Sequence, residues 1–269
     1  MQFYSEFFPH CSGIGLEVTT QLVMQNMTVF MACKDLVKCR AKAGEINEKR
    51  YPGGNSTTDK AFCLHLDLAD LGSVKNFADE LGDKFKEMNL TRLDLLINNA
   101  GLVSSVSGHK TEQGWEALFG IMHLGHFALT HWLKPFLLEP FDTPKENLNK
   151  PSRVINIASE AFLLGNFQPS FMTGNSTNAD MDLKGEETDN CQSYYYIFSC
   201  CPLWSCPHTN GYARAKLGNV LHAKRLQEHF EEEEIAAQSI LTSPLKTAAA
   251  NGATSSCNST EEETCSTSR

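Results

Sequence analysis

The chain has 269 residues, of which 41% are hydrophobic and 20% charged, enough for one α/β domain with a sizeable core. The formal net charge of −9 disfavours a nucleic-acid partner. The first residues lack the pattern of a secretory signal, and no run reaches the roughly 18 apolar residues that cross a bilayer. We therefore expect a cytoplasmic chain without a transmembrane segment, whose ten cysteines are mostly reduced thiols.

Apolar runs of strand length alternate along the chain with longer segments of helical spacing. In chain order they predict a helix over 13–27, a strand over 28–33, a helix over 35–49, a strand over 61–66, a helix over 73–88, a strand over 93–97, a helix over 115–137, a strand over 153–158 and a helix over 211–226. This alternation is typical of a single-domain α/β fold with a doubly wound parallel sheet of the Rossmann type. The first strand and the C-terminal elements stay open, since residues 1–11 combine strand-forming aromatics with Pro9.

Two regions interrupt this rhythm. Residues 165–210 are an insertion rich in Asn, Asp, Ser and Cys within a domain that we place at 1–242. Residues 243–269 are a Ser/Thr/Glu-rich tail with almost no large apolar residue, and we expect this tail to be disordered. The thiols and imidazole of the insertion do not have zinc-site spacing, so no metal is expected. These side chains are Cys191, Cys200, Cys201, Cys206 and His208.

Two positions in the first third of the chain suit nucleotide binding. Ser12, Gly13, Ile14 and Gly15 open the first helix, where glycines let the backbone approach a pyrophosphate that free N–H groups can bind. A plain turn explains the same residues equally well. Lys34 follows the strand 28–33, where a cation accommodates the 2′-phosphate of NADP(H), and an ordinary surface lysine is the alternative.

Polar or small residues follow two further strands. Asp67 and Leu68 come after the strand 61–66, and Asn99, Ala100 and Gly101 come after the strand 93–97. A doubly wound fold binds its ligand at the carboxyl ends of its strands, so both sets are candidate cofactor residues. An Asx turn and a tight turn are the structural alternatives.

A tyrosine and a lysine lie four residues apart near the start of the helix 211–226. Tyr212 and Lys216 share one helix face, and a cation beside a phenol favours the phenolate. This pair would suit Tyr212 to general acid/base work. Ser159, at the end of the strand 153–158, could donate a hydrogen bond to a substrate oxygen or could cap a turn.

In their order and context, these motifs resemble the short-chain dehydrogenase/reductase family. The resemblance rests on SGIG, ACK, the Asp67-Leu68 pair, NNAG, HLGHF, RVINIAS and YARAK, and is strongest toward the branch of retinol dehydrogenases and WW-domain oxidoreductases. It implies an NAD(P)-binding Rossmann-type domain in which Ser159, Tyr212 and Lys216 are catalytic. The cofactor contacts that it implies are Ser12, Gly13, Ile14, Gly15, Lys34, Asp67, Leu68, Asn99, Ala100, Gly101, Tyr212 and Lys216.

The resemblance also implies an activity. It predicts an NADP(H)-dependent oxidoreductase, with NAD(H) as the second candidate cofactor, that transfers hydride between the nicotinamide and an apolar carbonyl or alcohol. A glycine of the family's first loop is absent before Ser12, and Met122 stands where the family has an asparagine. These departures keep an alternative open: a truncated, catalytically impaired relative that acts as a binding or interaction protein. Substrate, reaction direction and oligomeric state, a homo-oligomer included, stay open.

Overall fold

The computed structural model describes residues 2–5, 13–54, 59–101, 110–137, 152–165, 209–230 and 235–242. Its strands are β1 (Gln2–Ser5), β2 (Val29–Cys33), β3 (Ala61–His65), β4 (Leu95–Asn98), β5 (Ser152–Ser159) and β6 (Ile235–Thr242). Its helices are α1 (Ile14–Met24), α2 (Leu36–Arg50), α3 (Leu71–Glu87), α4 (Ala117–Phe119), a π-helical turn (Gly120–Gly125), α5 (His126–Leu137), a 3₁₀ turn (Glu160–Leu164) and α8 (Thr209–Phe230).

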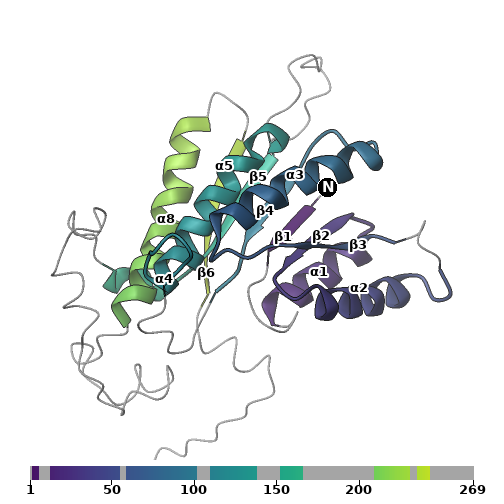
Figure 1. Ribbon diagram of the computed structural model, residues 1–269, viewed down its shortest axis with the longest axis horizontal. Coiled ribbons are helices and arrows are strands. Elements are labelled where there is room, and N and C mark those ends of the chain that lie inside the picture. Colours follow the sequence, from purple (N-terminus) through teal and green to yellow (C-terminus); the bar gives the residue numbers. More distant parts are fainter. Residues whose placement is uncertain are drawn as a thin grey trace, which may run out of the picture.

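The strands form one parallel sheet in the order β3-β2-β1-β4-β5-β6 (Figure 1). The chain first winds outward from β1 through β2 to β3, then returns to continue from β4 on the other side of β1. This reversal confirms the predicted doubly wound fold and places the topological switch point between β1 and β4. Ligands of such sheets bind outside the carboxyl ends of the strands at this point.

The structure resolves the two elements that the sequence left open. Residues Gln2–Ser5 form the central strand β1, with β2 and β4 as parallel neighbours. Pro9, which kept this strand open in the sequence, lies outside the described residues. At the far side, β6 pairs with β5 over all eight of its residues. The insertion over most of 165–210 and the tail 243–269 also lie outside the described residues.

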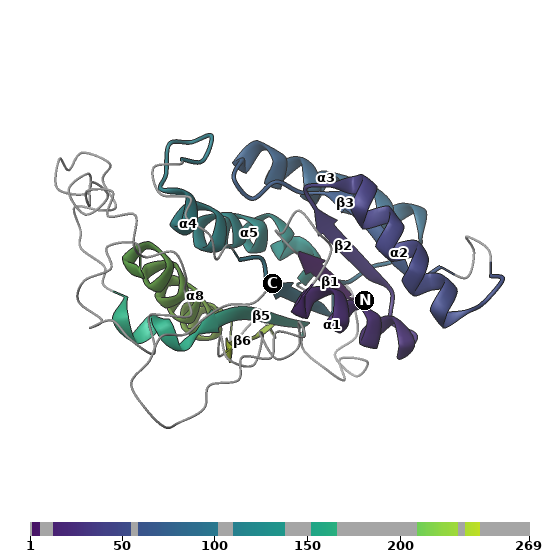
Figure 2. The ribbon, with the colours of Figure 1, turned by 90° about the horizontal axis from the view of Figure 1, so that it is seen from below.

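Two helix layers cover the two faces of the sheet (Figure 1). One layer contains α3, α5 and α8, and its buried core includes Phe77, Leu129 and Ala215. The other contains α1 and α2, whose buried residues Val23 and Ile46 share one core with residues of β2 and β4. The apolar strand β2 is buried along its whole length, as a strand covered on both faces must be. Figure 2 shows α8 alongside β5 and β6, which puts its first turns beside the carboxyl end of β5.

The predicted single helix over 115–137 is interrupted. After α4 the chain makes the π-helical turn and only then continues as α5. This turn is tightly enclosed: a Cβ atom on Gly125 would lie 2.7 Å from the carbonyl oxygen of Leu68. Apolar spacing alone does not distinguish a π-helical turn from a regular one, because the extra residue is accommodated by tertiary neighbours.

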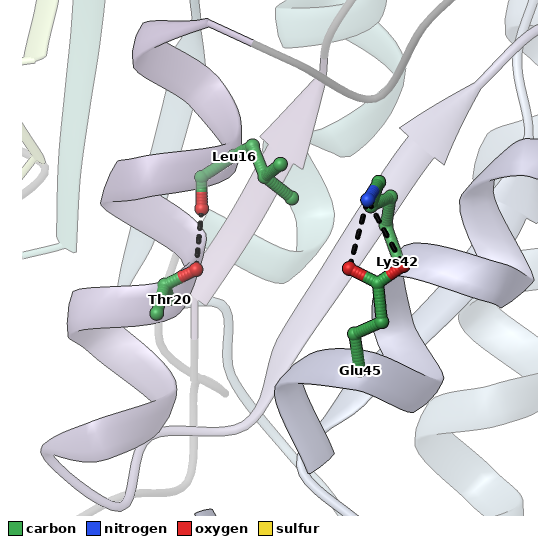
Figure 3. Close-up of polar contacts among 4 residues, drawn as sticks. All are labelled: Leu16, Thr20, Lys42 and Glu45. Atoms are coloured by element: carbon green, nitrogen blue, oxygen red, sulfur yellow. Dashed lines mark hydrogen bonds and ion pairs between the residues drawn. The ribbon is translucent and has the colours of Figure 1, made fainter. Parts of the chain in front are cut away.

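Two polar side chains of α1 and α2 bind partners within their own helix (Figure 3). The buried Thr20 donates its hydroxyl to the carbonyl oxygen of Leu16 at 2.8 Å, within its own helix. On α2, Lys42 Nζ lies 2.9 and 2.8 Å from the two carboxylate oxygens of Glu45.

No helix of the described segments is both long and apolar enough to cross a membrane.

One cysteine pair departs from the expectation of mostly reduced thiols. Cys39 of α2 and Cys63 of β3 are joined by a disulfide, with their Cα atoms 6.0 Å apart. Neither spacing nor composition indicated this pair, because only the packing of α2 on β3 brings the two residues together. Cys33 is buried and lies outside this disulfide, and the remaining cysteines lie outside the described residues.

Reduction of this disulfide is expected to lower the free energy of unfolding by about 3 kcal/mol, since the bond closes a loop between residues 24 apart. Thermal unfolding with and without a phosphine reductant measures this effect. A Cys39→Ala/Cys63→Ala double variant is the control and should be insensitive to the reductant. Equal melting temperatures of the unmodified chain under both conditions would show that the bond does not stabilise the fold.

Candidate functional site

The N-terminus of α1 is built to approach a ligand closely. Gly13 precedes the helix with φ 78° and ψ −156°, a conformation that a residue with a side chain rarely adopts. No described side chain caps this end of α1, so the first N–H groups stay available for an anion. Gly15 is buried and Ile14 is exposed. Ser12, the other residue predicted here, lies outside the described residues.

The structure joins two predicted cofactor residues in an ion pair. Lys34 Nζ lies 2.6 Å from Asp67 Oδ2, and the lysine side chain is 60% exposed. Asp67 Oδ1 accepts the Ala69 N–H at 2.9 Å, so the residue also forms the Asx turn that was its structural alternative. The neighbouring Asp35 caps α2 by accepting the Val37 and Lys38 N–H groups, which lowers the pKa of Asp35. Lys34 is therefore the cation that this strand end presents.

The other predicted strand-end residues divide into packing and exposed groups. Leu68 is 2% exposed and packs in the core against the π-helical turn, so its side chain is structural. Ala100 is buried, while Asn99 and Gly101 are partly exposed after β4. A Cβ atom on Gly101 would lie 3.7 Å from Met122 Sδ and 3.8 Å from Lys216 Nζ. Gly101 therefore lines the same place as the predicted lysine.

Lys216 is a buried cation beside an aromatic ring. Its side chain is 3% exposed, its Nζ donates to the Ile157 carbonyl oxygen at 3.0 Å, and it lies 5.5 Å from the centroid of the Tyr212 ring. Burial lowers the pKa of Lys216 to about 8, so the ammonium form still dominates at neutral pH. The predicted pair is thus assembled, with the cation next to the phenol ring and attached to β5.

Ser159 ends β5 and is almost completely buried. Its Oγ accepts the Ala161 N–H at 3.3 Å and caps the 3₁₀ turn, as the structural alternative predicted. A hydroxyl oxygen that accepts one hydrogen bond keeps its own hydrogen to donate. Capping and donation to a substrate oxygen are therefore compatible.

Comparison with known proteins settles the relationship. The model of the family described as short chain dehydrogenase matches residues 10–171, more than half of the chain. The chain belongs to the short-chain dehydrogenase family.

Individual relatives agree with this membership. The chain is 30% identical to mouse retinol dehydrogenase 14 over 82% of this chain and 54% of the relative, and 35% identical to human retinol dehydrogenase 13 over 57% and 40%. It thus spans about half the length of these curated relatives. Among solved structures, an uncharacterised protein from Mycobacterium Paratuberculosis is 26% identical with a TM-score of 0.57, over 89% of this chain and 67% of that chain. The Pseudomonas aeruginosa RhlG/NADP complex is 21% identical with a TM-score of 0.55, over 93% and 76%, and shares the fold.

Next to this candidate site lies a buried polar network that sequence reasoning missed. Asn98 Nδ2 donates to Asn156 Oδ1 at 2.8 Å, and Asn156 Nδ2 lies 3.2 Å from His222 Nδ1 and 3.1 Å from the Asn219 carbonyl oxygen. Asn219 Oδ1 lies 3.3 Å from His123 Nδ1. A signal existed in the sequence: Asn219 follows Lys216 by three residues, which puts both on one helix face.

Two histidines of this network, His123 and His222, and the nearby buried His126 are neutral at physiological pH. Burial lowers the pKa of His123 to about 4 and the pKa values of His126 and His222 to about 3. His123 and His126 were interpreted as structural from the sequence. The structure places His123 in the π-helical turn and His126 at the start of α5. The part of the chain that the structure describes has no group of three or more His, Cys, Asp or Glu residues that could hold a metal.

The residues present fit a nicotinamide dinucleotide, the cofactor that the family binds. The uncapped start of α1 after Gly13 suits a pyrophosphate, and Lys34 suits a phosphate on the adenosine ribose. Gly101 leaves open the space next to the Lys216 ammonium where a side chain would contact it. The start of α1, Lys34 and Lys216 thus offer hydrogen-bond donors along the carboxyl ends of β1, β2 and β4, where an extended dinucleotide would bind.

Proposed function

We propose that this protein is an NADP(H)-dependent oxidoreductase that interconverts an apolar carbonyl compound and its alcohol. The observation that carries the proposal is the assembled pair of Tyr212 and the buried, cationic Lys216, whose Nζ is 5.5 Å from the Tyr212 ring centroid. A buried ammonium is costly to maintain, so its retention beside a phenol argues for a chemical role. The curated relatives named retinol dehydrogenase make retinaldehyde and retinol the first substrate pair to test.

In this proposal, each residue has one task. The bound cofactor supplies or accepts hydride at the substrate carbon. Tyr212 gives its phenolic proton to the carbonyl oxygen, or takes it from the alcohol in the reverse direction. Lys216 stabilises the resulting phenolate by its charge. Ser159 donates its hydroxyl hydrogen to the same substrate oxygen and orients it.

The direct test combines binding and turnover. NADPH fluorescence is titrated against the purified chain, and retinol formed from retinaldehyde is then measured chromatographically. The proposal predicts saturable NADPH binding and retinol formation that depends on both cofactor and protein. Absence of NADPH binding by folded protein would refute it.

Lys34 is expected to set the cofactor preference. Lys34→Ala should narrow the preference for NADPH over NADH by about tenfold or more, because a charge-assisted hydrogen bond to a phosphate contributes roughly 1.5–3 kcal/mol. Asp67→Asn should widen the preference, since it removes the carboxylate charge that lies 2.6 Å from Lys34. Titration with both cofactors measures these ratios.

Lys42→Ala is the matched control for this prediction. It removes an equally charged lysine that pairs with Glu45 on the outside of α2 (Figure 3). This variant should keep the cofactor ratio of the unmodified chain. If the unmodified chain binds NADPH and NADH equally, Lys34 has no role in selection.

A further inference from the structure

Two side chains of α8 donate to one carbonyl oxygen of β5. Lys216 Nζ lies 3.0 Å and Asn219 Nδ2 lies 3.1 Å from the oxygen of Ile157. A carbonyl oxygen has two lone pairs, and these two donors use both. Because Lys216 and Asn219 are three residues apart on α8, the shared acceptor restrains both the rotation and the axial position of this helix turn.

Asn219 is itself held from the opposite side. Its Nδ2 donates to Ile157, so its Oδ1 faces His123 Nδ1 at 3.3 Å and must accept from it. This requirement assigns the ring proton of the neutral His123 to Nδ1. The ring approaches α8 closely because residue 218 is a glycine: a Cβ atom on Gly218 would lie 2.7 Å from His123 Nδ1.

The backbone of Asn219 is fixed as well. Its carbonyl oxygen accepts from Asn156 Nδ2 at 3.1 Å, and Asn156 precedes Ile157 on β5. Asn219 therefore connects α8 to β5 by two hydrogen bonds and to the π-helical turn by a third. The residue is 1% exposed, so water does not compete for these bonds.

We propose that Asn219 is a positioning residue for Lys216, because it fixes the carbonyl group that anchors the ammonium near Tyr212. The inference rests on the proposed function for its catalytic meaning, and it adds a residue that touches neither substrate nor cofactor. A lysine side chain has four flexible bonds, and one hydrogen bond leaves its position along α8 adjustable. The amide of Asn219, the second donor to the Ile157 oxygen, fixes the helix turn relative to that oxygen and so limits the positions of the Lys216 ammonium.

The decisive experiment measures the ionisation of Tyr212 directly. Phenolate absorbance is titrated against pH in each protein, and the curve of the same protein carrying Tyr212→Phe is subtracted. Lys216→Met defines the midpoint without the cation. Asn219→Leu, which keeps the side-chain volume and removes the amide, should raise the midpoint toward that of Lys216→Met. We expect about three- to tenfold less phenolate at a given pH, the equilibrium effect of one net hydrogen bond.

A matched control separates positioning from general stability. Asn47 makes a comparable clamp between α2 and β3, donating to the Ala61 carbonyl oxygen at 3.1 Å and accepting the Lys60 and Ala61 N–H groups. Asn47→Leu should lower the melting temperature and leave the Tyr212 midpoint unchanged. His123→Phe and Gly218→Ala, which disturb the group that holds Asn219, should raise the midpoint less than Asn219→Leu does. They also test the proposal if Asn219→Leu does not fold.

The outcomes distinguish this inference from the proposed function. A raised midpoint in a protein that neither binds NADPH nor reduces a carbonyl supports the positioning role and refutes the oxidoreductase. An unchanged midpoint in folded Asn219→Leu, or in both His123→Phe and Gly218→Ala, overturns the positioning role even if the unmodified protein turns over. An equal shift in Asn47→Leu also overturns it.

Discussion

Tyr212→Phe is expected to lower turnover of a carbonyl substrate by about 10²- to 10⁴-fold while NADPH affinity stays nearly unchanged. The phenylalanine ring keeps the packing of Tyr212 against the core and removes only the hydroxyl that carries the proton. Most of the proposed cofactor contacts lie elsewhere, among them the start of α1 and Lys34. Single-turnover kinetics with saturating NADPH, together with a binding titration, separates the two effects.

Two further variants calibrate this experiment. Tyr51→Phe removes the hydroxyl of an exposed tyrosine after α2 and should leave turnover unchanged. Lys216→Met removes the buried cation and should reduce turnover at neutral pH, most strongly where the phenolate form is required. Full activity of Tyr212→Phe would exclude the hydroxyl from the reaction.

Acid is expected to unfold this protein through its buried histidines. Burial lowers the pKa of His123 to about 4 and the pKa values of His126 and His222 to about 3, below the value of 6.5 for an exposed histidine. The unfolded chain therefore binds more protons than the folded chain below pH 6.5. The stabilisation is present above pH 6.5 and is lost as the pH falls toward 4 to 3.

The expected loss of folding free energy at acid pH is large. Each histidine contributes about 1.4 kcal/mol per pH unit in this window, so three remove roughly 6 kcal/mol by pH 5. A domain is stable by only about 5–15 kcal/mol, so cooperative unfolding is expected near pH 5 to 4. Urea unfolding at a series of pH values measures the slope.

Histidine substitutions test the assignment. His222→Phe should reduce the slope by about a third, whatever its effect at neutral pH, because one titrating group is removed. His131→Ala changes an exposed histidine of α5 and serves as the control with an unchanged slope. A slope that His222→Phe does not alter would show that other groups cause the acid transition.

Much of the fold could be predicted from local sequence patterns. The buried strand β2 is a continuous apolar run, and α3 has helical spacing of its core residues, so each pattern reports burial directly. The strand-end motifs follow because parallel strands bring their carboxyl ends to one edge. The candidate residue Lys34 could therefore be located without coordinates, and the pair of Tyr212 and Lys216 was located by its i, i+4 spacing on one helix.

The remaining features depend on contacts between distant segments. Whether Gln2–Ser5 forms a strand is decided by the open position between β2 and β4, and a four-residue strand has little periodicity of its own. The π-helical turn depends on the close approach of Gly125 to Leu68, and the Lys34–Asp67 ion pair on the adjacency of β2 and β3.

The amide and histidine network shows most clearly that some contacts cannot be predicted from local sequence patterns. Asn98, Asn156 and Asn219 are ordinary polar residues in the sequence, 58 and 63 positions apart along the chain. Burial favours hydrogen bonds between their polar groups, and only the pairing of β4 with β5 and the packing of α8 on β5 bring these groups together. Local propensity and periodicity carry no information about such pairing. The sequence therefore indicates the candidate catalytic residues, whereas the tertiary structure decides which residues hold them in place.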